Sequence, residues 1–306
     1  MKGITPKNDD LHRSLKPLPV EEWLDYYFYR RVAHRLVPTL IKFKISPNQI
    51  TTLSLLFGLL SAWLVYKHHF IAAGFVAIFA IILDCCDGQV ARLTGQTSPF
   101  GRAMDGLFDA AWITAYWVAL HKSHYFQSQG LFVFWLMFFS SISMVLHCWR
   151  FDARKLRYFE LTGKEENEQD LDAMQAWALF KTSLKKFNLP AAFLALAMTF
   201  QMYFFVRGSE EKKTVILSDQ EKKRAHALLD PIIHAWSYLG EGHHNTLVIL
   251  GTFMAPWSPY GLLVAFLTIL IPFNLWMFRT EWQWHKAVRL LKNEIDSIEK
   301  AYQASV

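Results

Sequence analysis

The chain has 306 residues, of which 53% are hydrophobic and 16% aromatic, and it carries a formal net charge of +6. Only 19% of the residues are charged, below the roughly 25% of soluble domains. This composition argues against a disordered chain, a coiled coil and a nucleic-acid-binding tail protein. Very apolar stretches between polar ends indicate a polytopic membrane protein. We interpret the excess of basic residues as lying on the cytoplasmic, membrane-facing side and not as a nucleic-acid patch, with a generally basic surface as the alternative.

The N-terminal region is predicted to lie in the cytoplasm. Its first 18 residues are polar and lack an apolar signal-peptide core, so we expect no cleavable signal. Residues 21–44 mix aromatic and aliphatic side chains with Arg and Lys. This pattern predicts an amphipathic helix on an anionic membrane surface, with an ordinary surface helix as the alternative. We therefore assign residues 1–47 to a cytoplasmic N-terminus with an interfacial helix.

Residues 48–278 are expected to form the membrane domain. Its apolar segments have about the length that a bilayer core of about 30 Å requires, and they lie at 49–66, 70–92, 104–120, 130–149, 189–206 and 246–278. Pro256 and Pro259 interrupt the last segment, so we expect two short helices there. The pattern predicts an all-α membrane bundle of about six transmembrane helices. The topology after residue 150 stays open.

Polar segments separate or follow these spans. We expect charged loops at about 150–188 and 207–243, and a polar C-terminal tail over 279–306. Charges of alternating sign at 207–230 are typical of a solvated loop or helix. The sequence His243–Asn245 precedes an apolar run, and we interpret it as a solvated helix start, with contact to a substrate as the alternative.

The distribution of basic residues predicts the orientation of the first half of the chain. Residues 1–47 carry nine Lys and Arg residues, which places the N-terminus in the cytoplasm. The loop 92–104, with Arg92 and Arg102, then returns to the cytoplasm, as does the basic cluster that begins at Arg150. We therefore expect an integral protein of a cell inner membrane or an endomembrane, with its polar site facing the cytoplasm.

Four carboxylates interrupt the apolar helices: Asp84, Asp87, Asp105 and Asp109. Each costs at least about 2.5–3.5 kcal/mol at the centre of a membrane helix, and together they repel one another. Helical spacing places each pair on one face of its helix, and the two helices are consecutive. Divalent cations would relieve the repulsion, and oxygen ligands favour Mg²⁺ or Mn²⁺. A proton or cation pathway in a transporter is the alternative.

The same segment resembles a known family. Between Asp84 and Asp109 the chain reads D-x2-D-G-x2-A-R-x8-G-x3-D-x3-D, which is similar at all eight fixed positions to the signature of the CDP-alcohol phosphatidyltransferases. Pro47, Asn48 and Thr51 resemble the start of the first span in this family. The resemblance is specific over about residues 45–110 and only topological beyond 130.

The resemblance implies that a CDP-lipid such as CDP-diacylglycerol donates its phosphatidyl group to the hydroxyl of a polar alcohol and releases CMP, with two divalent ions bridging the diphosphate. By the family pattern Asp84, Asp87 and Asp105 are metal ligands, and Asp109 is a ligand or the general base. The implied nucleotide-binding residues are Gly88, Ala91, Gly101, Arg92 and Asn48. Three of them are small, which leaves room for a planar ligand or for close helix packing.

The acceptor alcohol is not readable from the sequence. Arg150 and Arg154 lie one helical turn apart, which suits a phosphate clamp for a phosphorylated acceptor or a positive-inside anchor. Ala110 stands where some acceptor classes carry a basic residue. A CDP-linked small alcohol with diacylglycerol as acceptor is an alternative, as are a membrane transporter and a non-catalytic lipid-binding relative. The family commonly forms homodimers, and the sequence neither supports nor opposes one.

Overall fold

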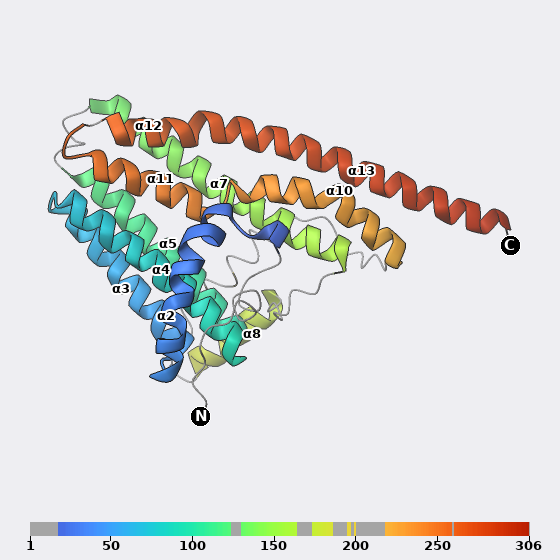
Figure 1. The fold of residues 1–306 in the computed structure, drawn as a ribbon, viewed down its shortest axis with the longest axis horizontal. Helices are drawn as coiled ribbons and strands as arrows, with labels where there is room; N and C mark the ends of the chain where they lie inside the picture. Colours follow the sequence, from blue (N-terminus) through green and yellow to red (C-terminus); the bar gives the residue numbers. More distant parts are fainter. Residues whose placement is uncertain are drawn as a thin grey trace.

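The computed structural model describes residues 18–123, 130–163, 173–185, 195–196, 199, 218–258 and 260–305. Within these ranges all regular structure is helical, which confirms the predicted all-α class (Figure 1). The elements in chain order are η1 (Leu18–Val20), η2 (Asp25–Tyr29), α2 (Arg30–Lys42), α3 (Pro47–Tyr66), α4 (Phe70–Thr94), α5 (Pro99–Lys122), α7 (Gly130–Thr162), α8 (Ala173–Lys185), α10 (Asp219–Ser237), α11 (Glu241–Met254), α12 (Tyr260–Thr268), η3 (Ile269–Phe273) and α13 (Asn274–Ser305).

Among the described residues, four helices are long and apolar enough to cross a membrane: Pro47–Tyr66, Phe70–Thr94, Gly130–Thr162 and Tyr260–Glu294. They confirm the polytopic membrane character, whereas the expected number of six spans is not confirmed. Most of the apolar segment predicted at 189–206 lies outside the described residues.

Helices α3, α4 and α5 pack together, and local signals fix where they start and stop. The Ser46 hydroxyl accepts from the Gln49 backbone N–H while the Gln49 side chain accepts from the Ser46 N–H, a capping box that starts α3. Helix α4 ends at Gly95, whose φ of 67° suits glycine. Ser98 then accepts from the Gly101 N–H to start α5. The loop 95–98 therefore holds the C-terminal end of α4 beside the N-terminal end of α5.

The predicted amphipathic helix at 21–44 is present as η2 and α2. Its apolar face, with Ala33 and Val37, is buried and packs on α4, where Gln89 Nε2 donates to the Arg30 carbonyl over 2.8 Å. Its other face is largely exposed. The helix therefore lies against the end of α4 that carries the aspartates, and its place at a membrane surface stays a prediction.

The C-terminal third differs from the expectation of two short helices and a polar tail. The chain does break between α11 and α12, near the predicted proline pair. After the break, however, α12, η3 and α13 follow one another without interruption to Ser305, as a single long rod in Figure 1. Pro272 lies within the π-helical turn η3. Proline has no backbone N–H to donate within the helix. The wider π-turn tolerates this missing hydrogen bond, so Pro272 does not end the helix.

The charged segments expected as loops are largely helical. Helix α7 continues to Thr162, and α10 begins at a second capping box formed by Ser218 and Glu221. The C-terminal end of α7 packs with α10 and α13 (Figure 1) around a core of its own. Its fully buried members include Leu229, Ile233 and Trp236, which recur at helical spacing among the charged residues of α10. We call the C-terminal end of α7, together with α10 and α13, the helical extension.

Candidate active site

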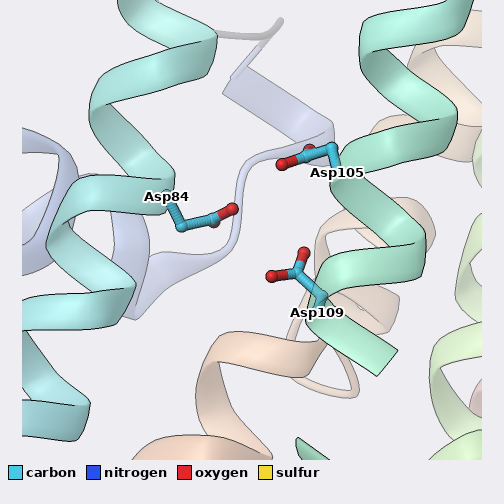
Figure 2. A group of neighbouring side chains, drawn as sticks. All are labelled: Asp84, Asp105 and Asp109. Carbon is cyan, nitrogen blue, oxygen red and sulfur yellow. The ribbon is translucent and has the colours of Figure 1, made fainter. Parts of the chain in front are cut away.

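Three carboxylates meet between α4 and α5. Asp84 comes from α4, and Asp105 and Asp109 lie one turn apart on α5; Figure 2 shows the three side chains pointing toward one another. One carboxylate oxygen from each lies within 4.8 Å of the other two. The spacing on each helix thus brings together three of the four aspartates that the sequence predicts as one site.

The fourth aspartate, Asp87, lies one turn further along α4 and lines the same cavity. It is 5% exposed, and the Thr51 hydroxyl donates to its Oδ2 over 2.6 Å. It is not a member of the three-residue cluster. On α5, the Trp112 indole N–H donates to Asp109 Oδ1 over 3.3 Å. Thr51 and Trp112 therefore hold two of the carboxylates in place.

The aspartates line a cavity of about 1120 Å³, and so does every residue that the resemblance assigns to the nucleotide: Asn48, Gly88, Ala91, Arg92 and Gly101. A Cβ added at Gly101 would lie 3.2 Å from Asn48 Oδ1, and one added at Gly88 would lie 3.1 Å from Arg92 Nη2. Larger side chains at the two glycines would therefore occupy space beside Asn48 and Arg92.

The structure does not bring Arg150 and Arg154 to this cavity. Arg154 Nε donates to Glu281 Oε2 of α13 over 3.0 Å, and Arg150 Nη1 lies 3.4 Å from Glu281 Oε1. Lys155, the next residue along α7, does line the cavity and contacts Asp152 over 2.6 Å. Consecutive residues of a helix point about 100° apart, so one step along the chain separates the side chains that face α13 from those that face the site.

The cavity also has a wall that the sequence does not reveal. Glu22, Asp25 and Arg30 contribute from the N-terminal segment, and Glu241 and Asn245 contribute from α11. The sequence His243–Asn245 is a weak signal for the α11 part of this wall, although its pattern predicts a solvated helix start.

That interpretation is wrong for two of its three residues. Asn245 is 7% exposed and lines the cavity, and His244 is fully buried. His244 Nδ1 donates to the Gly240 carbonyl over 2.7 Å, and its Nε2 lies 3.0 Å from His147 Nδ1 on α7. The carbonyl can only accept, so His244 Nδ1 carries the proton and Nε2 accepts from His147. This pair fixes the start of α11 against α7.

The charges of the N-terminal wall are unevenly paired. Arg30 Nε lies 3.0 Å from Glu21 Oε2 but 3.9 Å from Asp25 Oδ2. Burial, with the neighbouring charge of Glu22, raises the pKa of Asp25 to about 7. The wall is therefore short of positive charge on the side of Asp25.

Residues 44–207 match the model of the CDP-alcohol phosphatidyltransferase family. The chain belongs to the CDP-alcohol phosphatidyltransferase family. The matched segment contains all four aspartates and the predicted nucleotide set. It excludes the wall formed by the N-terminal segment and α11, as well as α10 and α13 of the helical extension.

Curated relatives are similar over a shorter segment. The chain is 37% identical over 75 residues to an archaetidylinositol phosphate synthase of Pyrococcus horikoshii, which covers 24% of this chain and 40% of the relative. It is 38% identical over 80 residues to a CDP-diacylglycerol–serine O-phosphatidyltransferase of Helicobacter pylori, which covers 26% and 32%. A bifunctional IPC transferase and DIPP synthase of Aquifex aeolicus is 36% identical over 80 residues, which is 18% of its length. The chain therefore spans less than half the length of these relatives.

Proposed function

We propose that this protein transfers a phosphatidyl group from a CDP-lipid, CDP-diacylglycerol, to the hydroxyl of a polar alcohol and releases CMP, in a reaction that depends on divalent metal ions. The observation that carries the proposal is the meeting of Asp84, Asp105 and Asp109 within 4.8 Å. They meet in the cavity that all the other motif residues line. Membership of the family supports the reaction class.

The donor set of the cluster suits a divalent metal. Its three residues offer only carboxylate oxygens, which Mg²⁺ and Mn²⁺ prefer. Three neighbouring carboxylates in an apolar bundle also repel one another unless a cation balances them. We propose Asp84, Asp87, Asp105 and Asp109 as the ligands of two such ions. Bound there, the ions would supply positive charge that neutralises the departing phosphate.

The remaining residues of the motif have roles in binding and proton transfer. Gly88, Ala91 and Gly101 leave space for the cytidine, and Asn48 and Arg92 face the diphosphate. Asp109 takes the proton of the acceptor hydroxyl as the alcohol oxygen attacks the phosphorus. A carboxylate is a weak base for an alcohol, so it acts on a hydroxyl that is already polarised. The indole of Trp112 keeps the carboxylate of Asp109 oriented.

We propose that the site opens at the cytoplasmic face of a cell inner membrane or an endomembrane. The aspartates lie toward the C-terminal end of α4 and the N-terminal end of α5, and α2, from the basic N-terminal region, packs on the same end of α4. A site at this depth receives a water-soluble nucleotide and lipid chains together. A homodimer is the assembly that the family resemblance suggests.

The test is release of CMP by the purified full chain in lipid–detergent micelles. The assay supplies CDP-diacylglycerol, Mn²⁺ or Mg²⁺ and a mixture of candidate alcohols. We expect release that EDTA stops and that Asp84→Asn abolishes. Absence of release would lead to a second assay with CDP-linked small alcohols as donors and diacylglycerol as acceptor. Failure of both reactions with a folded protein would contradict the proposal and favour a transporter or a non-catalytic lipid-binding relative.

A further inference from the structure

The wall that the sequence did not reveal is built where the N-terminal segment meets the start of α11. Glu22 Oε2 accepts from the Gly242 backbone N–H over 2.9 Å and lies 3.3 Å from His243 Nδ1. A Cβ at Gly242 would lie 2.5 Å from Asp25 Oδ1, so the glycine is what lets this carboxylate approach the helix. The carboxylate of Asp25 thus lies beside the residue that follows Glu241.

Two carboxylates of this wall lack a close cation among the described residues. Arg30 is engaged more closely by Glu21 than by Asp25, and Asp25 Oδ1 is buried without a hydrogen-bond partner. Glu241 Oε1 accepts from the neutral side-chain amide of Asn245 over 3.1 Å. Glu241 also lies within electrostatic range of Asp84 and Asp109. The wall therefore presents two carboxylates without a close cation next to the reacting groups.

The cavity as a whole has the same imbalance. Its described lining has eight carboxylates, Glu22, Asp25, Asp84, Asp87, Asp105, Asp109, Asp152 and Glu241, against three Lys and Arg side chains, Arg30, Arg92 and Lys155. Two divalent ions would balance the four motif aspartates, and Lys155 already contacts Asp152. The carboxylates that remain, Glu22, Asp25 and Glu241, all lie on the wall. Such a surface repels a phosphorylated acceptor and attracts a cationic one.

From this charge distribution we infer that the acceptor is an alcohol that carries an ammonium group, held with the ammonium on Asp25 and Glu241 and the hydroxyl toward Asp109. This inference rests on the proposed function and specifies its acceptor. The alcohol oxygen forms a bond to the phosphorus of the phosphatidyl group, and its proton passes to Asp109. The bond from that phosphorus to the CMP oxygen breaks, and CMP leaves with the electron pair.

The test compares acceptors one at a time in the presence of CDP-diacylglycerol and Mn²⁺. Ethanolamine and serine represent ammonium alcohols, glycerol 3-phosphate and inositol phosphate represent phosphorylated ones, and glycerol is neutral. We expect ammonium alcohols to stimulate CMP release at least about tenfold more than phosphorylated ones. Glu241→Gln should raise the KM for the ammonium alcohol by about tenfold and leave the KM for CDP-diacylglycerol nearly unchanged. Calorimetric titration of ethanolamine into the protein should show the same weakening.

A matched control is Glu160→Gln, which removes an exposed carboxylate of α7 that pairs with Arg157 and should leave both KM values unchanged. Asp25→Asn provides the same test as Glu241→Gln if the latter does not fold. Stimulation by phosphorylated alcohols alone would overturn the inference and leave the proposed function standing. An unchanged KM in both wall variants would overturn the placement of the ammonium. No release with any acceptor would instead contradict the proposed function.

Discussion

The active-site region and the helical extension pair charged groups in opposite ways. Between α4 and α5, three carboxylates lie within 4.8 Å of one another. In the extension, acidic groups are matched with arginines: Glu281 of α13 with Arg154, and Glu294 with Arg224 over 2.9 Å. The extension surrounds an aromatic and aliphatic core, whereas the active-site region surrounds a cavity of about 1120 Å³.

This difference separates residues that we assign to function from residues that hold the fold together. A carboxylate placed in an apolar bundle beside other carboxylates lowers stability, and we propose that a bound cation offsets this cost. A paired charge at a helix–helix contact adds little to stability and needs no ligand. Mutations in the active-site region should therefore change activity and metal binding. Mutations in the helical extension should change the free energy of unfolding.

The largest effect is expected at Asp109. Asp109→Asn should lower CMP release by about 10²–10⁴-fold, because an amide cannot take the hydroxyl proton. The melting temperature in detergent should not fall, since the substitution removes a repulsive charge. Glu294→Gln in the helical extension is the control and should retain activity. Full activity of Asp109→Asn would show that this carboxylate is not the base.

In the helical extension the largest effect is expected at Trp236, which is fully buried. Trp236→Ala should lower the free energy of unfolding by about 3–5 kcal/mol through lost packing and a cavity. Thermal unfolding followed by circular dichroism measures this loss. Mn²⁺ binding to the folded protein should be unchanged. If metal affinity fell in parallel with stability, the two regions would not be independent.

Metal ions should stabilise the active-site region. At a free Mn²⁺ concentration of 100 times the dissociation constant, the free energy of unfolding should rise by about 2.7 kcal/mol. EDTA should reverse the rise, and Asp84→Asn should reduce it. Thermal shift with and without Mn²⁺ measures both. An equal shift in wild type and Asp84→Asn would place the ion elsewhere.

The smallest effect is expected at Arg154. Because its partner is Glu281 and it does not line the cavity, Arg154→Gln should leave the KM of every acceptor unchanged. The acceptor panel measures this directly. A tenfold rise in the KM of a phosphorylated alcohol would restore the phosphate-clamp interpretation and remove the contrast between the two regions.

Much of the site is predictable because it is local. Asp84 and Asp87 share one helical face, and Asp105 and Asp109 share another. The short loop between the two helices then leaves little choice about where they meet. The same periodicity predicts the apolar helices.

What the sequence does not predict depends on packing between distant segments. Asp25 and Glu241 lie 216 positions apart, and no local pattern brings them to one wall. In α10, Leu229, Ile233 and Trp236 are scattered among charged residues, so the sequence alone does not identify them as one apolar face. The structure identifies this face because α7 and α13 pack on it. For Arg154 and Lys155, the spacing fixes the angle between them but not which one faces the cavity.

The most direct measurement is the number of Mn²⁺ ions bound per chain, by electron paramagnetic resonance titration of the purified protein and of Asp84→Asn. We expect about two bound ions in the wild type, held by the carboxylate cluster, and loss of at least one in Asp84→Asn, with the fold intact by circular dichroism. Identical titration curves for the two proteins would contradict the assignment of the aspartate cluster as the metal centre.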